Sequence, residues 1–174
     1  KKSDKYFDIL FIGQISIRKG LHYLLEAFNK FKHPHKRLHI VGSHTFDKDF
    51  FIKKLNDDNI KYYGHVNHLE LNNIINKCHV FVLPSIEEGF ATVILQALSA
   101  GCPVIVSENT GAMEFVNDNN CGYVVPIRNS NSILEKLDLM SQNKDIIDNF
   151  SNNAIKKMKK QTWESYVDEL DLFI

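Results

Sequence analysis

The chain contains 174 residues, of which 44% are hydrophobic, and its 21 basic and 21 acidic residues give a formal net charge of zero. These values fit one domain of ordinary size with an apolar core. The balanced charge excludes the global field expected of a nucleic-acid-binding protein, and no apolar run approaches the roughly 20 residues of a membrane span.

Short apolar runs alternate with segments of helical periodicity along the chain. The predicted strands, in chain order, are 7–12, 37–42, 60–64, 79–84, 103–107 and 122–126. They are mostly continuous runs of Val, Ile, Leu and Phe, which is typical of a sheet that helices cover on both faces. The predicted helices are 21–31, 47–55, 67–77, a segment that starts near Thr92, and two or three pieces between 130 and 174.

Some helix ends carry local signals in the sequence. Asn67 with Glu70, and Ser132 with Glu135, have the spacing of capping boxes, so we expect these residues at helix starts. Thr162 is the expected cap of the last helix.

The alternation of strand and helix, about every 20 residues, predicts an α/β domain. We expect a doubly wound, mainly parallel six-stranded sheet of the Rossmann type, in one domain over residues 1–174. The alternative, a (β/α)₈ barrel, needs eight units and about 250 residues. No signal-peptide-like stretch precedes the first strand. The chain does not begin with Met, so we expect an excised or processed piece of a longer protein.

The cysteines and histidines give no sign of a disulfide framework or a metal site. Cys78, Cys102 and Cys121 are odd in number and far apart, which is more typical of reduced thiols in a cytoplasmic protein. Three histidines between 33 and 39 lack the spacing of a metal-binding helix. We therefore expect no bound metal.

The segment PSIEEGFATVILQALSAGCPV (84–104) places two acidic residues and a glycine before the most apolar helix. That helix, which starts near Thr92, has almost no polar face and is expected to be buried. In parallel sheets, ligands bind outside the carboxyl ends of the strands, where Glu87 to Phe90 lie. The N–H groups from Phe90 onward suit an anion, and Gly89 allows a ligand to approach the backbone closely. This arrangement predicts a phosphate at the N–H groups and a carboxylate for sugar hydroxyls.

The same segment resembles the signature of family-4 retaining glycosyltransferases (group 1), PS-x-x-EGFG-x-x-x-LEA-x-A-x-G-x-PV. The likeness continues, in order, through FIGQISIRKGLHYLLEAF, NIKYYGHVNHLELNNIINKCHVFVLPS and ENTGAMEFVNDNNCGYVVP. It implies the carboxyl-terminal, donor-binding half of a GT-B fold, with the amino-terminal acceptor domain absent. The implied reaction moves a sugar from a nucleotide-diphospho-sugar to a glycan or lipid-linked acceptor, in glycan, capsule or glycolipid synthesis, and needs no cofactor.

The resemblance assigns the two catalytic roles to Glu88 and Lys19. Glu88 would touch the donor sugar, and Lys19 would neutralise the diphosphate. Gln96 stands where the family has a glutamate for the ribose, and Gln14 stands where it has an arginine for the diphosphate. Arg18 is a candidate replacement, but neighbours on a loop rarely point the same way, so we expect one positive charge to be missing. An amide has one uncharged acceptor oxygen, so we also expect weaker ribose binding.

The other matched positions are expected to act largely through the backbone. Val66 would contact the nucleotide base, so its side chain does not reveal which base is bound. Thr110 and Gly111 would close the sugar pocket. At the helix start, alanine replaces the second glycine of the family motif but keeps its N–H group. The matched positions there are Gly89, Phe90, Ala91 and Thr92.

Two other functions stay open on the sequence alone. The glutamines at 14 and 96 favour a degenerate, non-catalytic binding or scaffold module, and an epimerase of similar fold that acts on nucleotide sugars is a third interpretation. The basic run KKMKK (156–160) suits peripheral contact with anionic lipid at the inner face of the membrane, although a solvated helix face is the simpler interpretation. We expect a cytoplasmic protein.

Overall fold

The computed structural model describes residues 2–43 and 57–160 of the chain. Six strands form one sheet in the order β3-β2-β1-β4-β5-β6, and all neighbouring pairs are parallel. The strands are β1 (Phe7–Ile12), β2 (Lys36–Val41), β3 (Ile60–Gly64), β4 (Val80–Leu83), β5 (Val104–Ser107) and β6 (Gly122–Val125). The predicted doubly wound parallel sheet is confirmed. The predicted helix 47–55 and the predicted cap Thr162 lie outside the described residues.

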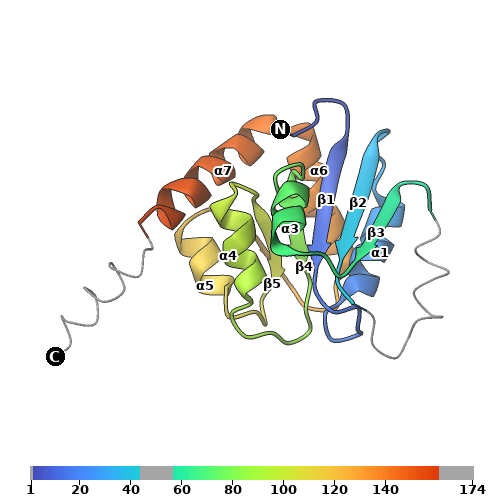
Figure 1. The fold of residues 1–174 in the computed structure, drawn as a ribbon, viewed down its shortest axis with the longest axis horizontal. Helices are drawn as coiled ribbons and strands as arrows, with labels where there is room; N and C mark the ends of the chain where they lie inside the picture. Colours follow the sequence, from blue (N-terminus) through green and yellow to red (C-terminus); the bar gives the residue numbers. More distant parts are fainter. Residues whose placement is uncertain (1, 44–56, 161–174) are drawn as a thin grey trace.

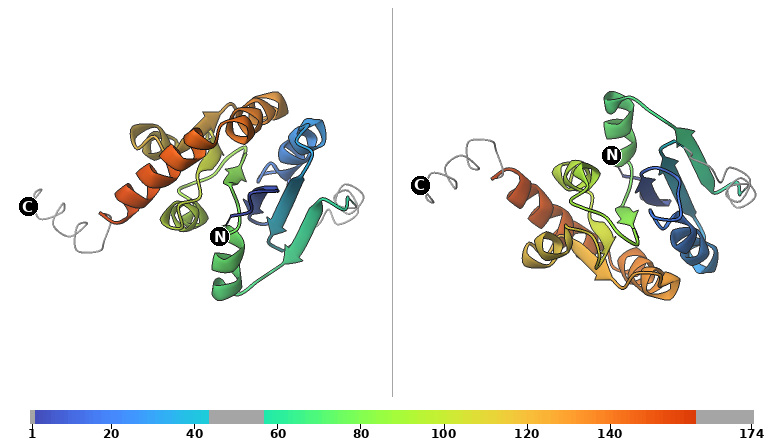
Figure 2. Two further views of the ribbon diagram at one scale, coloured as in Figure 1. Left: turned by 90° about the horizontal axis from the view of Figure 1, so that it is seen from above. Right: turned by 90° about the horizontal axis from the view of Figure 1, so that it is seen from below.

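Helices cover both faces of the sheet (Figure 1). They are α1 (Leu21–Lys30), α3 (His68–Ile75), α4 (Thr92–Ser99), α5 (Met113–Asp118), α6 (Ser130–Gln142) and α7 (Lys144–Met158). Figure 2 shows α1 and α6 side by side on one face of the sheet, with α3 and α4 on the other. The long helix α7 packs against both α4 and α6. The strands therefore lie in an apolar interior, as their continuous hydrophobic sequences require.

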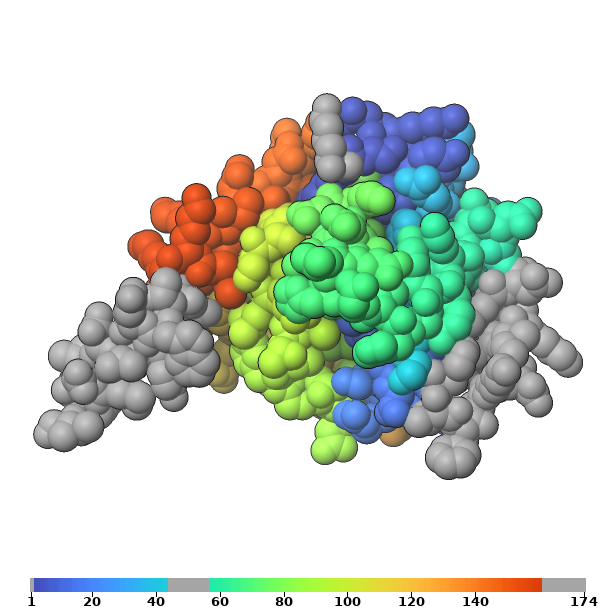
Figure 3. Space-filling view, in the orientation of Figure 1, coloured from blue at the N-terminus to red at the C-terminus, as the bar shows by residue number. Residues whose placement is uncertain are grey.

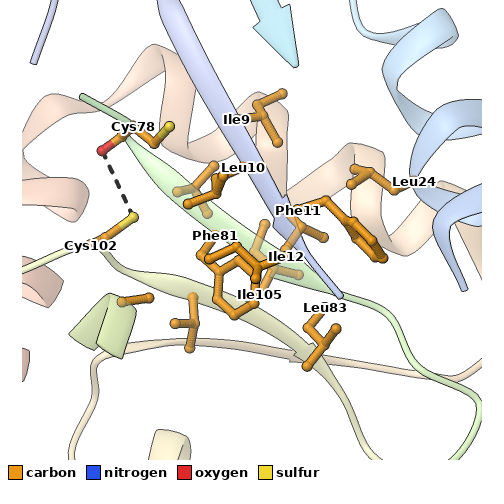
Figure 4. Close-up of a cluster of buried hydrophobic side chains, with 14 of the residues drawn as sticks. Ile9, Leu10, Phe11, Ile12, Leu24, Cys78, Phe81, Leu83, Cys102 and Ile105 are labelled. Atoms are coloured by element: carbon orange, nitrogen blue, oxygen red, sulfur yellow. Dashed lines mark hydrogen bonds between the residues drawn. The ribbon is translucent and has the colours of Figure 1, made fainter. Parts of the chain in front are cut away.

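The core is centred on β1, whose residues are all buried. Figure 4 shows apolar side chains of β1, β4 and β5 packed together, among them Ile9, Leu10, Phe11, Ile12, Phe81, Leu83 and Ile105. Burying each such side chain stabilises the fold by about 1.5–3 kcal/mol.

Cys78, Cys102 and Cys121 are buried and free, and Cys102 Sγ lies 3.8 Å from the Cys78 carbonyl oxygen. Burial raises the pKa of Cys102 to about 12, so this thiol is not an activated nucleophile.

Helix α4 is less buried than its sequence predicts. Its buried residues are Ile94, Ala97 and Leu98. Leu95 and Gln96 remain partly exposed and line a shallow groove between α4 and α3. The expectation of full burial is wrong because α4 is an outer layer: the sheet covers one side of the helix, and α3 does not close over the opposite side.

Two further local predictions have different outcomes at helix starts. At α3 the predicted cap is confirmed, because the Asn67 side chain accepts a hydrogen bond from the Glu70 N–H group at 2.9 Å. At α6 the predicted box at Ser132 is wrong, because Asn129 is the cap and accepts from the Ser132 N–H group at 2.9 Å. The sequence did not predict α5, whose six residues are too few to show helical periodicity.

A partly buried ion-pair network lies near the amino end of β1, at the opposite edge of the sheet from the predicted site. The Asp8 carboxylate accepts hydrogen bonds from Arg37 Nε at 2.6 Å and Arg37 Nη2 at 2.9 Å. His39 Nε2 lies 2.9 Å from the same carboxylate, and His39 Nδ1 lies 2.8 Å from the Tyr63 hydroxyl. Burial alone would raise the pKa of Asp8, but the hydrogen bonds with His39 and Arg37 outweigh burial and lower this pKa to about 2.

This network makes folding stability depend on acid pH. The folded-state pKa of Asp8 is below its ordinary value of 3.8, so the ionised network stabilises the fold above about pH 4 and this stabilisation is lost as the pH falls toward 2. We expect a loss on the order of 2 kcal/mol in the free energy of unfolding. Urea unfolding between pH 7 and 2.5 measures it, and Asp8→Asn should remove the part of the slope below pH 4. An unchanged slope in this variant would contradict the assignment.

The strand order places a topological switch point between β1 and β4. The chain leaves β1 toward β2 on one side and leaves β4 toward β5 on the other, so the two loops that follow these strands separate at their carboxyl ends. Such a switch point is where open α/β sheets bind ligands. The loop 13–20 after β1 and the loop 84–91 after β4 therefore flank the position at which a ligand is expected.

Candidate functional site

The loops after β1 and β4 contact each other at the carboxyl edge of the sheet. The Ile86 N–H group donates a hydrogen bond to the Arg18 carbonyl oxygen at 2.8 Å. Gly20, in the left-handed conformation with φ of 70°, lies so close to Pro84 that a Cβ atom would overlap the Pro84 carbonyl oxygen. Figure 3 shows the two loops, blue and yellow-green, adjacent at the lower edge of the molecule. Backbone contacts thus fix the positions of the side chains on both loops.

Lys19 and Glu88, the two residues predicted to be catalytic, meet between these loops. Lys19 Nζ donates a hydrogen bond to Glu88 Oε2, and each of the two side chains is 14% exposed. The aliphatic part of Lys19 lies over Gly13, where a Cβ atom would be 3.7 Å from Lys19 Cδ. The ammonium group is therefore held at the carboxyl end of β1, beside the start of the β4–α4 connection.

Arg18 reaches the same carboxylate, contrary to the expectation from its position in the loop. Arg18 Nη1 lies 3.5 Å from Glu88 Oε2 and donates to the Glu87 carbonyl oxygen at 3.0 Å. The backbone turns tightly here, because the Gly20 N–H group donates to the Ile17 carbonyl oxygen at 3.0 Å. The turn directs two consecutive cationic side chains toward the β4–α4 loop, so the expectation that these neighbours point in different directions is wrong.

The amino end of α4 lies next in the chain after this ion cluster. The helix begins at Thr92, and its cap residue Ala91 has an extended backbone and makes no side-chain cap hydrogen bond. The first turn contains no acidic residue. Helix N-termini carry unpaired N–H groups and a partial positive charge, so this end suits a phosphate oxygen. Phe90 lies outside the helix and is 44% exposed.

Gly89 and the loop after β5 form the third side of the site. A Cβ atom at Gly89 would have no neighbour within 4 Å, so the backbone is open to a ligand. The loop after β5 is joined to this segment, since the Glu88 N–H group donates to the Asn109 carbonyl oxygen and the Gly111 N–H group donates to the Glu88 carbonyl oxygen, both at 3.1 Å. Thr110 is buried, and its hydroxyl donates to the Ser107 carbonyl oxygen at 2.9 Å.

The other predicted residues are not members of the ion cluster. Gln14 is exposed, and its amide is uncharged. Gln96 lines the groove of about 540 Å³ between α4 and α3, which His68 and Asn72 also line. Its Oε1 atom is buried and has no hydrogen-bond partner among the described residues. Val66 is half-buried just before α3, near the His68 end of this groove.

Three polar residues that support the site were not identified from the sequence. Ser85 and Ser107 are fully buried at the ends of β4 and β5, and the Ser107 hydroxyl donates to the Ser85 carbonyl oxygen. Asn109 Nδ2 donates to the Ile86 carbonyl oxygen at 3.1 Å. A signal for these residues was present in the sequence, because small polar residues follow two buried strands. Side chains at such positions can donate hydrogen bonds to the backbone carbonyl groups of the loops.

The described residues contain neither a candidate metal site nor a membrane span. No group of three or more His, Cys, Asp or Glu side chains within 2–43 and 57–160 could hold a metal ion. In the same ranges, no helix has the length and apolar character needed to cross a bilayer.

Comparison with known proteins places these features in a family. The family model for glycosyl transferases group 1 matches residues 1–157. The uncharacterized glycosyltransferase MJ1607 of Methanocaldococcus jannaschii is 31% identical over 166 residues, which cover 92% of this chain and 43% of that protein. The capsular polysaccharide biosynthesis glycosyltransferase CapM of Staphylococcus aureus is 24% identical over 192 residues, covering 100% of this chain and 50% of CapM. The chain thus spans half or less of the length of these two relatives.

Solved structures agree on the fold. The C-terminal domain of the glycosyl transferase group 1 family protein LpcC from Francisella tularensis matches with a TM-score of 0.80 and 24% identity, over 89% of this chain and 85% of that chain. HepE from Anabaena, in complex with UDP and glucose, matches with a TM-score of 0.81 and 20% identity, over 90% of this chain and 44% of that chain. The fold is therefore the carboxyl-terminal Rossmann-like half of a GT-B architecture, and family membership does not favour the scaffold and epimerase alternatives. The chain belongs to the group 1 glycosyltransferases.

Proposed function

We propose that this chain is the donor-binding domain of a retaining, family-4-like glycosyltransferase that transfers a sugar from a nucleotide-diphospho-sugar. The observation that carries the proposal is the meeting of Lys19 and Glu88 at the switch point between β1 and β4, beside the amino end of α4. A cation, a carboxylate and a helix N-terminus are the groups that a sugar diphosphate needs.

In this proposal the diphosphate lies between Lys19 and the first N–H groups of α4. The ammonium and the positive helix end stabilise the negative charge that develops on the leaving diphosphate during transfer. The open side of Gly89 lets the diphosphate approach the backbone. Backbone contacts hold the two loops together before the ligand arrives, so the backbone needs little reorganisation when the reaction occurs.

The carboxylate of Glu88 then accepts hydrogen bonds from hydroxyls of the donor sugar. The loop with Thr110 and Gly111 is bonded to the Glu88 backbone and closes this side of the site. Gln96 Oε1, which has no hydrogen-bond partner among the described residues, is an acceptor for a ribose hydroxyl once its side chain turns toward the solvent side of the groove. The backbone at Val66 is the proposed contact for the base.

The acceptor, in this account, binds to a part that the relatives have and this chain does not span. The name of CapM supports a role in polysaccharide synthesis, and we propose a glycan or lipid-linked acceptor. The buried, free thiols support a cytoplasmic location. The lysines at 156–160 lie at the carboxyl end of α7, where cations complement the helix dipole, and this supports a solvated face over a lipid contact.

A thermal-stability screen tests the proposal. A ligand that binds only the folded state at 100 times its Kd stabilises it by about 2.7 kcal/mol, which raises the unfolding midpoint by roughly 5–10 °C in a chain of this size. We expect such a rise with one or more nucleotide-diphospho-sugars and with the matching nucleoside diphosphate, but not with the free sugar. No rise with any of them at millimolar concentration would contradict the proposal.

We expect no sugar transfer by these 174 residues alone, and measurable transfer would refute the proposed division of roles between the two halves.

A further inference from the structure

Two cationic side chains at the candidate site share one carboxylate oxygen. Lys19 Nζ is hydrogen-bonded to Glu88 Oε2, and Arg18 Nη1 lies 3.5 Å from the same atom. The hydrogen bond from Arg18 Nη1 to the Glu87 carbonyl oxygen, at 3.0 Å, holds the guanidinium against the β4–α4 loop. The Arg18 side chain is 52% exposed and that of Lys19 is 14% exposed, so the guanidinium lies on the solvent side of the pair.

The loop after β1 carries its positive charge at only these two positions. Gln14, the first side chain after Gly13, is neutral and exposed. Residues 13–20 contain Arg18 and Lys19 and no other cationic residue. A diphosphate carries more than one negative charge, so a single ammonium would leave part of that charge without a partner. The structure offers one further cation on the loop, and its guanidinium already contacts the carboxylate that Lys19 binds.

A carboxylate bound by a guanidinium and an ammonium occupies a position that suits a phosphate. Guanidinium groups bind carboxylate and phosphate oxygens with the same fork geometry, and lysine binds both as a point charge. In the unliganded protein, Glu88 therefore holds the two cations together despite their mutual repulsion. A diphosphate that carries more charge than a carboxylate would compete with Glu88 for the same two side chains.

We propose that Arg18 is the second diphosphate-binding cation of this chain, replacing the charge missing at position 14, and that a bound diphosphate displaces the Glu88 carboxylate from Arg18 and Lys19. This inference rests on the proposed function, because it assigns roles within the same donor site. The displaced Glu88 is then available to sugar hydroxyls. Recognition of the diphosphate and recognition of the sugar are thus coupled through one exchange of ionic partners.

A double-mutant cycle tests the role of Arg18. Calorimetry first identifies which of UDP, GDP and ADP binds the wild-type protein, and the same nucleotide is then titrated into Arg18→Gln, Gln14→Arg and the double variant. Arg18→Gln should weaken binding about tenfold, as expected for loss of one charge-assisted contact. Gln14→Arg should restore most of this loss in the double variant. Arg128→Gln, which removes an exposed arginine after β6, is the matched control and should bind like the wild type.

The possible results separate this inference from the proposed function. If the wild type binds none of the three nucleotides, the proposed function fails and the inference fails with it. If the wild type binds but Arg18→Gln binds equally well, only the role of Arg18 is overturned. If Arg18→Gln weakens nucleotide binding and Gln14→Arg does not restore it in the double variant, the claim that Arg18 replaces a cation at position 14 is overturned. Unfolding midpoints of all variants show whether any loss reflects unfolding.

The displacement of Glu88 has its own test. Glu88→Gln removes the anion that competes for the two cations, so the nucleoside diphosphate should bind several-fold tighter to this variant than to the wild type. In the wild type, contacts between Glu88 and the sugar should make the nucleotide sugar bind tighter than its nucleoside diphosphate. In Glu88→Gln, this difference in affinity should disappear. Equal or weaker binding of the nucleoside diphosphate by Glu88→Gln would overturn the exchange of partners.

Discussion

Replacing Lys19 by methionine should reduce nucleoside diphosphate affinity on the order of 50-fold while the fold remains intact. The affected group is the less exposed of the two cations, and its ammonium lies where the proposed diphosphate binds. Methionine keeps an aliphatic chain over Gly13, so the packing seen there is preserved. The loss should exceed that of Arg18→Gln, because the Arg18 side chain is 52% exposed and its interactions are screened by water.

Calorimetry of Lys19→Met against a matched lysine variant measures this effect. Lys77→Met removes an exposed lysine next to the amino end of β4, at the opposite edge of the sheet, and should bind like the wild type. The free energy of unfolding of Lys19→Met should change by less than about 1 kcal/mol, because Glu88 keeps Arg18 as a partner and has access to solvent. Equal affinities for Lys19→Met and Lys77→Met would rule out an ammonium contact with the diphosphate.

Two glycine-to-alanine substitutions should affect different properties: Gly20→Ala should lower the stability of the fold, and Gly89→Ala should weaken nucleotide binding. At Gly20 a Cβ atom would overlap the Pro84 carbonyl oxygen, and the residue has a φ of 70°. The combined steric and backbone cost is about 3 kcal/mol or more, a fall of roughly 10 °C in the unfolding midpoint. At Gly89 a Cβ atom would meet nothing within 4 Å, so Gly89→Ala should leave the midpoint within about 2 °C of the wild type.

Ligand binding distinguishes these two variants further. If the diphosphate approaches the backbone at Gly89, the added methyl group should weaken nucleotide binding in Gly89→Ala although the protein is as stable as the wild type. Calorimetric titration and thermal unfolding of both variants supply the measurements. A stable Gly20→Ala would contradict the close contact between the loops, and unchanged nucleotide affinity in Gly89→Ala would contradict the proposed path of the diphosphate.

The sheet was predictable because its strands are continuous apolar runs. β1 is buried along its whole length, and the alternation of such runs with helical segments restricts the fold to a doubly wound sheet. Helix α5 was missed because six residues show no period, and the burial of α4 was overestimated because composition does not reveal which side a neighbouring helix covers. Apolar residues on the outer side of a helix are common in folded proteins.

The site was predictable in outline but not in its contacts. The sequence placed Glu88 and Lys19 near the carboxyl ends of two strands, and the strand order brings those ends together. It did not reveal that Arg18 also reaches Glu88, because that contact depends on the turn closed by Gly20 and on the hydrogen bond to the Glu87 carbonyl oxygen. Nor did it reveal the Asp8 network, which joins residues from three strands. Contacts of this kind arise only from tertiary packing.

A crystal structure with a bound nucleoside diphosphate would show directly whether Lys19 and the amino end of α4 bind the diphosphate. We expect diphosphate oxygens about 3 Å from Lys19 Nζ and from the first N–H groups of α4, with the Glu88 carboxylate no longer paired with Lys19. A nucleotide bound elsewhere on the molecule, with the Lys19–Glu88 ion pair still in place, would contradict this expectation.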